Sequence, residues 1–118
     1  MEKILVVCAH PDDEVLGCGG TLLKHKKKKD EINLLYVFEG SSGRYQGKDK
    51  HILSAKDKKK RKQSAIKVGK FLNAKTVNFF DYENLNCNSD IKNNISKNLS
   101  SLIKKINPTI IYTHSSKD

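Results

Sequence analysis

Residues 4–25, ILVVCAHPDDEVLGCGGTLLKH, constrain the fold more than any other part of this sequence. Residues 3–8 form a nearly continuous apolar run, which is typical of a strand covered on both faces in a parallel sheet. The run is followed by a charged turn, His10-Pro11-Asp12-Asp13-Glu14, and then by a glycine-rich stretch that opens a helix predicted over residues 17–29. Three consecutive carboxylates repel one another, and a bound cation relieves that repulsion.

The rest of the chain alternates strand-like and helix-like segments. Strands are predicted at 31–38, 75–80 and 109–113, and helices at 52–72 and 90–106, although the lysine-rich first half of 52–72 is expected to fray. This alternation predicts an α/β fold, a three-layer α/β/α sandwich with a mostly parallel, Rossmann-like sheet. Right-handed crossovers bring the carboxyl ends of such strands to one edge, so the charged turn, residues 39–50, Asp81 and His114 are expected to share a cleft.

Composition narrows the class of protein. The 118 residues suit a single domain, and 23 Lys and Arg against 13 Asp and Glu give a net charge of +10. The lysine-rich stretches at 24–29 and 56–62 are interpreted as solvated helix faces or, as the alternative, as a surface for a polyanion. Aromatic residues do not interleave with them, so no specific nucleic-acid binding is predicted.

The cysteines and the hydropathy of the sequence indicate the cellular compartment of the protein. Three cysteines without CxxC spacing disfavour a disulfide framework and a zinc ribbon, and Cys8 is expected in the core. Met1 is followed at once by a strand, with no signal peptide and no apolar run long enough to span a bilayer. We therefore expect a cytoplasmic protein.

The last predicted strand is followed by only five residues, so we expect residues 1–118 to be one domain whose C-terminal part is missing.

The charged turn has two interpretations on its spacing alone. A catalytic zinc takes three protein ligands and keeps a position for water, and His10 and Asp13 can aim at one point across the turn. Asp12 would then be free to act as a general base. In the other interpretation the carboxylates are ordinary charges at a helix N-terminus, and His10 is a hydrogen-bonded histidine at a strand end.

Residues 9–25, AHPDDEVLGCGGTLLKH, resemble the opening of the LmbE-like, or PIG-L, family of zinc-dependent N-deacetylases. Three further segments are similar to the family more weakly. Arg61 begins a segment similar to its R-x-x-E motif, FFD at 79–81 is similar to the end of its third strand, and IIYTHSSKD at 110–118 is similar to the start of its T-H-x-x-x-D-x-N-x-D-H block.

The resemblance implies a site and a reaction. His10 and Asp13 match two zinc ligands, Asp12 matches the general base, and Arg61, Asp81 and His114 match positions that hold the substrate. The reaction implied is removal of an acetyl group from an N-acetylated amino sugar or glycoconjugate, with Zn²⁺ as cofactor.

Two departures from the family pattern matter. Ser64 replaces the Glu of R-x-x-E, so an ion pair of Arg61 is expected to be absent. The family's third zinc ligand is the last His of the block, beyond Asp118, and a two-ligand site is expected to hold zinc weakly. His114 is the candidate substitute, whereas His25 and His51 are expected to be exposed. The alternative is a non-catalytic α/β domain that binds a sugar, nucleotide or partner without metal, although Gly17, Gly19 and Gly20 do not form GxGxxG.

Overall fold

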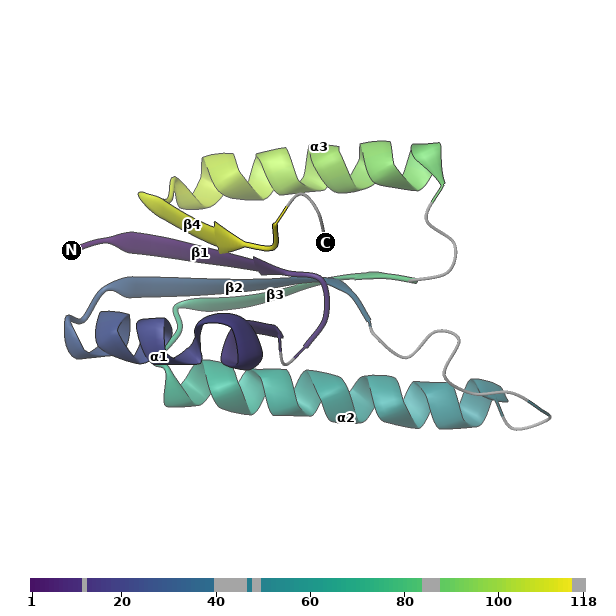
Figure 1. The fold of residues 1–118 in the computed structure, drawn as a ribbon. Coiled ribbons are helices and arrows are strands. Elements are labelled where there is room, and N and C mark those ends of the chain that lie inside the picture. The colour runs from purple at the N-terminus through teal and green to yellow at the C-terminus, as the bar shows by residue number, and fades with distance from the viewer. Residues whose placement is uncertain (12, 40–46, 48–49, 84–87, 116–118) are drawn as a thin grey trace.

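The fold is a parallel sheet between two layers of helices (Figure 1). The computed structural model describes residues 1–11, 13–39, 47, 50–83 and 88–115, with the side chains of 13–16 and 50–51 left out. In chain order the elements are β1 (Lys3–Cys8), α1 (Asp13–Lys27), β2 (Glu31–Phe38), α2 (Lys50–Phe71), β3 (Thr76–Tyr82), α3 (Ser89–Ile106) and β4 (Ile110–Thr113). The strands run parallel in the order β3-β2-β1-β4. The predicted α/β/α class is confirmed.

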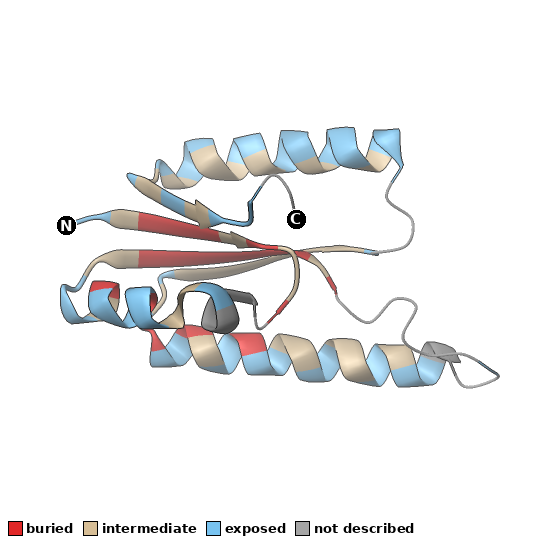
Figure 2. Cartoon of the chain, viewed as in Figure 1, coloured by how far each residue is buried: buried red, intermediate tan, exposed pale blue. Residues whose placement is uncertain are grey.

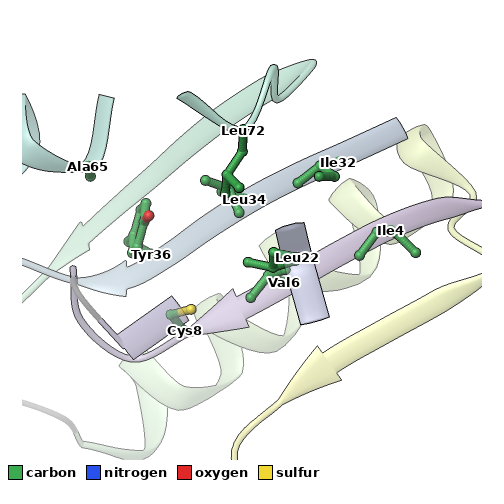
Figure 3. Packing of buried hydrophobic residues seen from close by; sticks show 9 residues of the cluster. All are labelled: Ile4, Val6, Cys8, Leu22, Ile32, Leu34, Tyr36, Ala65 and Leu72. Carbon is green, nitrogen blue, oxygen red and sulfur yellow. The ribbon is translucent and has the colours of Figure 1, made fainter. Parts of the chain in front are cut away.

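Each face of the sheet has its own apolar core. On the side of α1 and α2, buried residues form one cluster, shown in Figure 3: Ile4, Val6, Cys8, Leu22, Ile32, Leu34, Tyr36, Ala65 and Leu72. On the other side, Leu5, Leu35 and Val37 pack against the apolar stripe of α3. Successive residues of β1 and β2 thus point to opposite cores, which explains why these strands read as continuous apolar runs.

Helix α3 has both of its ends fixed by asparagine. The side chain of Asn88 accepts a hydrogen bond from the backbone N–H of Ile91 at 2.9 Å, which caps the helix N-terminus. At the other end Asn107 adopts a left-handed backbone with φ 53°, and its N–H donates to the carbonyl of Ile103. The helix predicted over 90–106 is therefore confirmed to within one residue.

Helix α2 approaches the sheet closely at a glycine. A Cβ atom placed on Gly69 would lie 2.5 Å from Cγ2 of Val77 in β3. That separation is shorter than van der Waals contact, so a side chain at this position requires the helix, the strand or the Val77 side chain to shift.

Three predicted boundaries are wrong in informative ways. Helix α1 begins at Asp13 rather than at residue 17, with a non-helical kink at Cys18, because the acidic residues suit a first helical turn. The first half of α2, predicted to fray, is helical from Lys50. Strand β3 extends to Tyr82, so Asp81, predicted to lie in a loop, belongs to the strand.

The expected exposure of His25 is also wrong, since this side chain is buried, with 7% of its surface exposed. Its Nδ1 is hydrogen-bonded to Asp30 Oδ2 at 2.7 Å, and its Nε2 is hydrogen-bonded to the Tyr112 hydroxyl at 2.8 Å. The hydrogen bond from His25, together with one from the backbone N–H of Glu2, holds the pKa of Asp30 below its usual value. The network joins the end of α1 to β4.

Figure 2 shows how burial is distributed: the central strands are buried, whereas the sides of the helices that face away from the sheet are exposed. Within the described part of the chain, no helix has the length and apolar character needed to cross a membrane.

Candidate functional site

The strand order creates a crevice at the carboxyl edge of the sheet. From β1 the chain moves outward through β2 and β3, and it then returns to place β4 on the other side of β1. In open parallel sheets, ligands bind outside the carboxyl ends of the strands at such a switch point. Here the switch point lies between β1, which leads into Ala9 and His10, and β4, which leads into His114.

Ala9 ties three segments together at this edge. Its backbone N–H donates to Nε2 of His114 at 3.0 Å, and its carbonyl accepts from the N–H of Phe38 at 2.8 Å. The neighbouring His10 lies over the end of β2, with its ring centroid 6.0 Å from that of Phe38. His10 and His114 are thus held on adjacent strand ends, as the topology predicted.

A cavity of about 370 Å³ opens beside these residues, between the ends of β1, β2 and β4 and the start of α3. Val7, Val37, Phe38 and Ile95 form part of its apolar wall, and its polar side chains come from Lys92, Ser96, Thr113 and His114. An apolar cavity of this volume with a few polar groups is typical of a small-molecule site.

The predicted metal centre falls partly outside the described residues. Asp12 lies outside them, and Asp13 begins α1 but its side chain is among those left out. Among the side chains that are described, no three His, Cys, Asp or Glu residues converge as a metal site. The predicted ligands, the imidazole of His10 and the carboxylate of Asp13, are groups that zinc prefers, and His10 lies at the switch point.

His114 is placed at the site but is already engaged. Because Nε2 of His114 accepts the Ala9 N–H, its lone pair is not available to a metal ion in this arrangement. The geometry therefore gives no support to His114 as the substitute third ligand, and it leaves His114 as part of the cavity wall.

Asp81 has an unusual conformation at the end of β3. Its backbone is left-handed, with φ 61°, where the register between β2 and β3 shifts. Its Oδ2 accepts from Nζ of Lys62, while its buried Oδ1 has no hydrogen-bond partner in the described part of the chain. A strained backbone and an unsatisfied carboxylate oxygen are features that recur at functional sites.

Lys62, which sequence reasoning missed, is the counter-ion of Asp81. Its Nζ also lies 5.2 Å from the centroid of the Phe79 ring. No local signal distinguishes Lys62 from the lysines around it, because its partners are in β3.

Arg61, which like Asp81 was predicted to bind substrate, forms an ion pair within its own helix. Its Nε donates to Oδ2 of Asp57, one turn earlier in α2, at 3.2 Å. The expected absence of an ion pair is therefore wrong, because Asp57 supplies the carboxylate that Ser64 lacks.

The fold and the placement of this crevice define an α/β domain of the Rossmann-like class with a candidate site at its switch point. The family model described as PIG-L, GlcNAc-PI de-N-acetylase, matches residues 5–118. The chain belongs to the PIG-L family, which confirms the resemblance seen in residues 9–25. A search of curated proteins finds no significant match.

Solved structures share the fold. The chain is similar to 4-carboxy-2-hydroxymuconate hydratase from Pseudomonas putida, with 27% identity and a TM-score of 0.80 over 100% of this chain and 49% of that one. It is also similar to N,N'-diacetylchitobiose deacetylase from Pyrococcus horikoshii, with 24% identity and a TM-score of 0.71 over 93% and 39%. A zinc-inhibited form of teicoplanin deacetylase gives 14% identity and a TM-score of 0.71 over 94% and 55%. The chain thus spans about half the length of these proteins or less.

Proposed function

We propose that this chain carries part of the active site of a zinc-dependent N-deacetylase that removes the acetyl group from an N-acetylated amino sugar. The observation that carries the proposal is the position of His10 at the switch point, directly after Ala9, which lines a cavity of about 370 Å³. Membership in a family named for a de-N-acetylase supports it, as do neighbours that are deacetylases.

In this proposal His10 and Asp13 hold the zinc ion, which when bound supplies a Lewis acid for the acetyl carbonyl. A solved neighbour is described as zinc-inhibited, which supports zinc as the metal to test. Asp12 takes a proton from the attacking water and returns it to the departing amine. The protein is proposed to act in the cytoplasm on a small sugar or glycoconjugate.

Binding of the sugar is assigned to the rest of the crevice. Among the described residues the buried Oδ1 of Asp81 has no partner, so a sugar hydroxyl is proposed to donate to it while Lys62 donates to the other carboxylate oxygen. His114 is proposed to contact the substrate from the cavity wall. Arg61 is proposed to bind substrate only if it leaves Asp57.

The test combines metal content with acetate release from N-acetylglucosamine-type amides by the purified chain. We expect His10→Ala to lose bound zinc, and Asp12→Asn to retain zinc while hydrolysis falls by about 10²–10⁴-fold, the usual contribution of a general base. Asp90→Asn, an exposed carboxylate on α3, is the matched control and should change neither quantity.

Two results would contradict the proposal. Zinc retention by His10→Ala equal to that of the unchanged chain would remove His10 from the ligand set. A folded chain that binds no zinc even when titrated with excess Zn²⁺ would favour the non-catalytic sugar-binding domain instead, whereas loss of weakly held zinc on dialysis is expected of a two-ligand site.

Hydration is a second candidate reaction, because a hydratase is 27% identical over the whole of this chain. Both reactions use an activated water at an unsaturated carbon. Assaying addition of water to a carbon–carbon double bond alongside acetate release separates them: turnover of an unsaturated carboxylic acid without acetate release favours the hydratase.

A further inference from the structure

The side of α2 that faces away from the sheet carries five exposed lysines. By the helical period they share one face of the helix, in two groups separated by Gln63 and Ser64: Lys56, Lys59 and Lys60, and then Lys67 and Lys70. Buried Ala65 lies on the opposite side of α2, against the core, so the lysines do not share a face with the packing residues. Figure 2 shows this outer side of α2 as exposed.

Large apolar side chains lie on the same side of α2, at both of its ends. Ile52 is 58% exposed near the start of the helix, and Phe71 is 63% exposed at its end. By the helical period Ile52 falls beside Lys56, and Phe71 falls beside Lys67. These two side chains do not belong to the core on the sheet, which uses the opposite side of α2.

Helix α1 extends this surface. Between α1 and α2 lies an apolar groove of about 490 Å³, lined in part by Leu23, which is 43% exposed, and by Lys67 and Phe71. Lys24 and Lys27 are exposed on α1, one helical turn after Gly20 and Leu23, respectively. We call these exposed lysines of α1 and α2, with Leu23, Ile52 and Phe71, the basic apolar face.

The two helices of this face contain few acidic residues. Asp57 is the single acidic residue of α2, it is half-buried, and it pairs with Arg61. In α1 the acidic residues are Asp13 and Glu14, at the end of the helix opposite to Lys24 and Lys27. The face therefore presents a concentrated positive charge together with exposed apolar groups.

The chemistry of this face selects among partners. A second copy of the chain would bring the lysines against themselves in a two-fold interface, where like charges repel. A nucleic acid would satisfy the lysines but leave Leu23 and Ile52 in water. The 22-residue helix is about 33 Å long, and charges spread along it match an extended planar surface better than a compact protein partner.

We propose that the basic apolar face docks on the surface of an anionic lipid bilayer, lying along it without spanning it. Lysines attract the negative headgroups, and apolar side chains such as Phe71 enter the boundary between headgroups and acyl chains. Lys26, whose Nζ lies 4.2 Å from the Phe71 ring centroid, keeps a positive charge beside that anchor. The proposal is independent of whether the crevice binds zinc.

The test is co-sedimentation of the purified chain with vesicles of phosphatidylcholine containing about one-third phosphatidylglycerol. The triple variant Lys59→Gln/Lys67→Gln/Lys70→Gln should bind about 100-fold more weakly, at about fivefold for each lysine near an anionic surface. The matched control, Lys97→Gln/Lys104→Gln/Lys105→Gln, removes the same charge from exposed positions on α3 and should weaken binding far less. Phe71→Ser should weaken binding while leaving its salt dependence unchanged.

Three results would overturn the proposal. Equal losses in both triple variants would mean that net charge, and not this face, governs adsorption. Equal sedimentation with pure phosphatidylcholine vesicles would exclude recognition of anionic lipid. Absence of vesicle binding, together with binding of a labelled DNA duplex that the α2 triple variant abolishes, would assign the face to nucleic acid. Far-ultraviolet circular dichroism confirms that each variant is folded.

Discussion

The close approach of α2 to β3 predicts opposite effects for the same substitution at two glycines. Gly69 lies in α2 against Val77, where a new Cβ would be 2.5 Å from Cγ2. Gly20 lies in α1, and a Cβ there would meet no atom within 4 Å. Gly69→Ala and Gly20→Ala therefore make the same chemical change in a helix, with and without a steric clash.

The expected free energies follow from two opposing effects. Replacing a helical glycine by alanine stabilises a helix by about 0.5–1 kcal/mol, and this should be the whole effect of Gly20→Ala. At Gly69 the gain is offset by overpacking, which costs about 1–3 kcal/mol in a well-packed core. Gly69→Ala should therefore lower the free energy of unfolding by about 1 kcal/mol, leaving the two variants about 2 kcal/mol apart.

Urea unfolding followed by circular dichroism measures both changes, and a third variant isolates the cause. In a Val77→Ala background the clashing methyl group is gone, so Gly69→Ala should become neutral or stabilising there. The reasoning is refuted if Gly69→Ala stabilises the unchanged chain as much as Gly20→Ala does. It is also refuted if the Val77→Ala background leaves the effect of Gly69→Ala unaltered.

Other consequences of the structure are open to direct measurement. The His25 hydrogen bond lowers the pKa of Asp30 in the folded chain below its value near 3.8 in the unfolded chain. The ionised carboxylate therefore stabilises the fold at pH values above 3.8, and this stabilisation is lost as the pH falls through the lower pKa of the folded chain. Asp30→Asn should therefore flatten the loss of stability below about pH 4 in urea titrations, and an unchanged profile would contradict this. Tyr112→Phe removes a hydrogen bond to buried His25 and should cost about 1 kcal/mol of unfolding free energy, whereas Tyr82→Phe, with an exposed hydroxyl contact, should cost less. Asn88→Ala removes the cap of α3 and should lower the free energy of unfolding by about 1 kcal/mol, whereas Asn88→Ser should be close to neutral. Equal stability of the unchanged chain and both variants would exclude capping by Asn88.

Local patterns in the sequence were sufficient for most of the fold. The strands predicted at 3–8 and 31–38 match β1 and β2, because strands buried on both faces read as unbroken apolar runs. The apolar rhythm of residues 90–106 likewise gave α3. The family was evident from residues 9–25, where the charged turn follows the first strand.

The rest depended on contacts between distant residues. The environment of His25 is set by Tyr112, which lies 87 residues later. The lysines around His25 in the sequence therefore led to the wrong prediction that its side chain is exposed. Lys62 and Asp81 meet only because α2 packs beside β3, and nothing local marks Lys62 among its neighbouring lysines. In the same way, the hydrogen bond that occupies Nε2 of His114 comes from Ala9, on the adjacent strand end.

The central position of β1 has a consequence for how the chain acquires its structure. Val7 pairs with Thr113 of β4, and a hydrogen bond joins these residues although they lie 106 positions apart. At roughly 5–20 residues per second, a ribosome needs roughly 5–20 seconds to make that interval. One edge of the first strand therefore waits, with open backbone donors and acceptors, until residues 110–113 have been made. That interval is when a nascent chain is most exposed to edge-to-edge pairing with another polypeptide, and chaperone binding to β1 would be most valuable then.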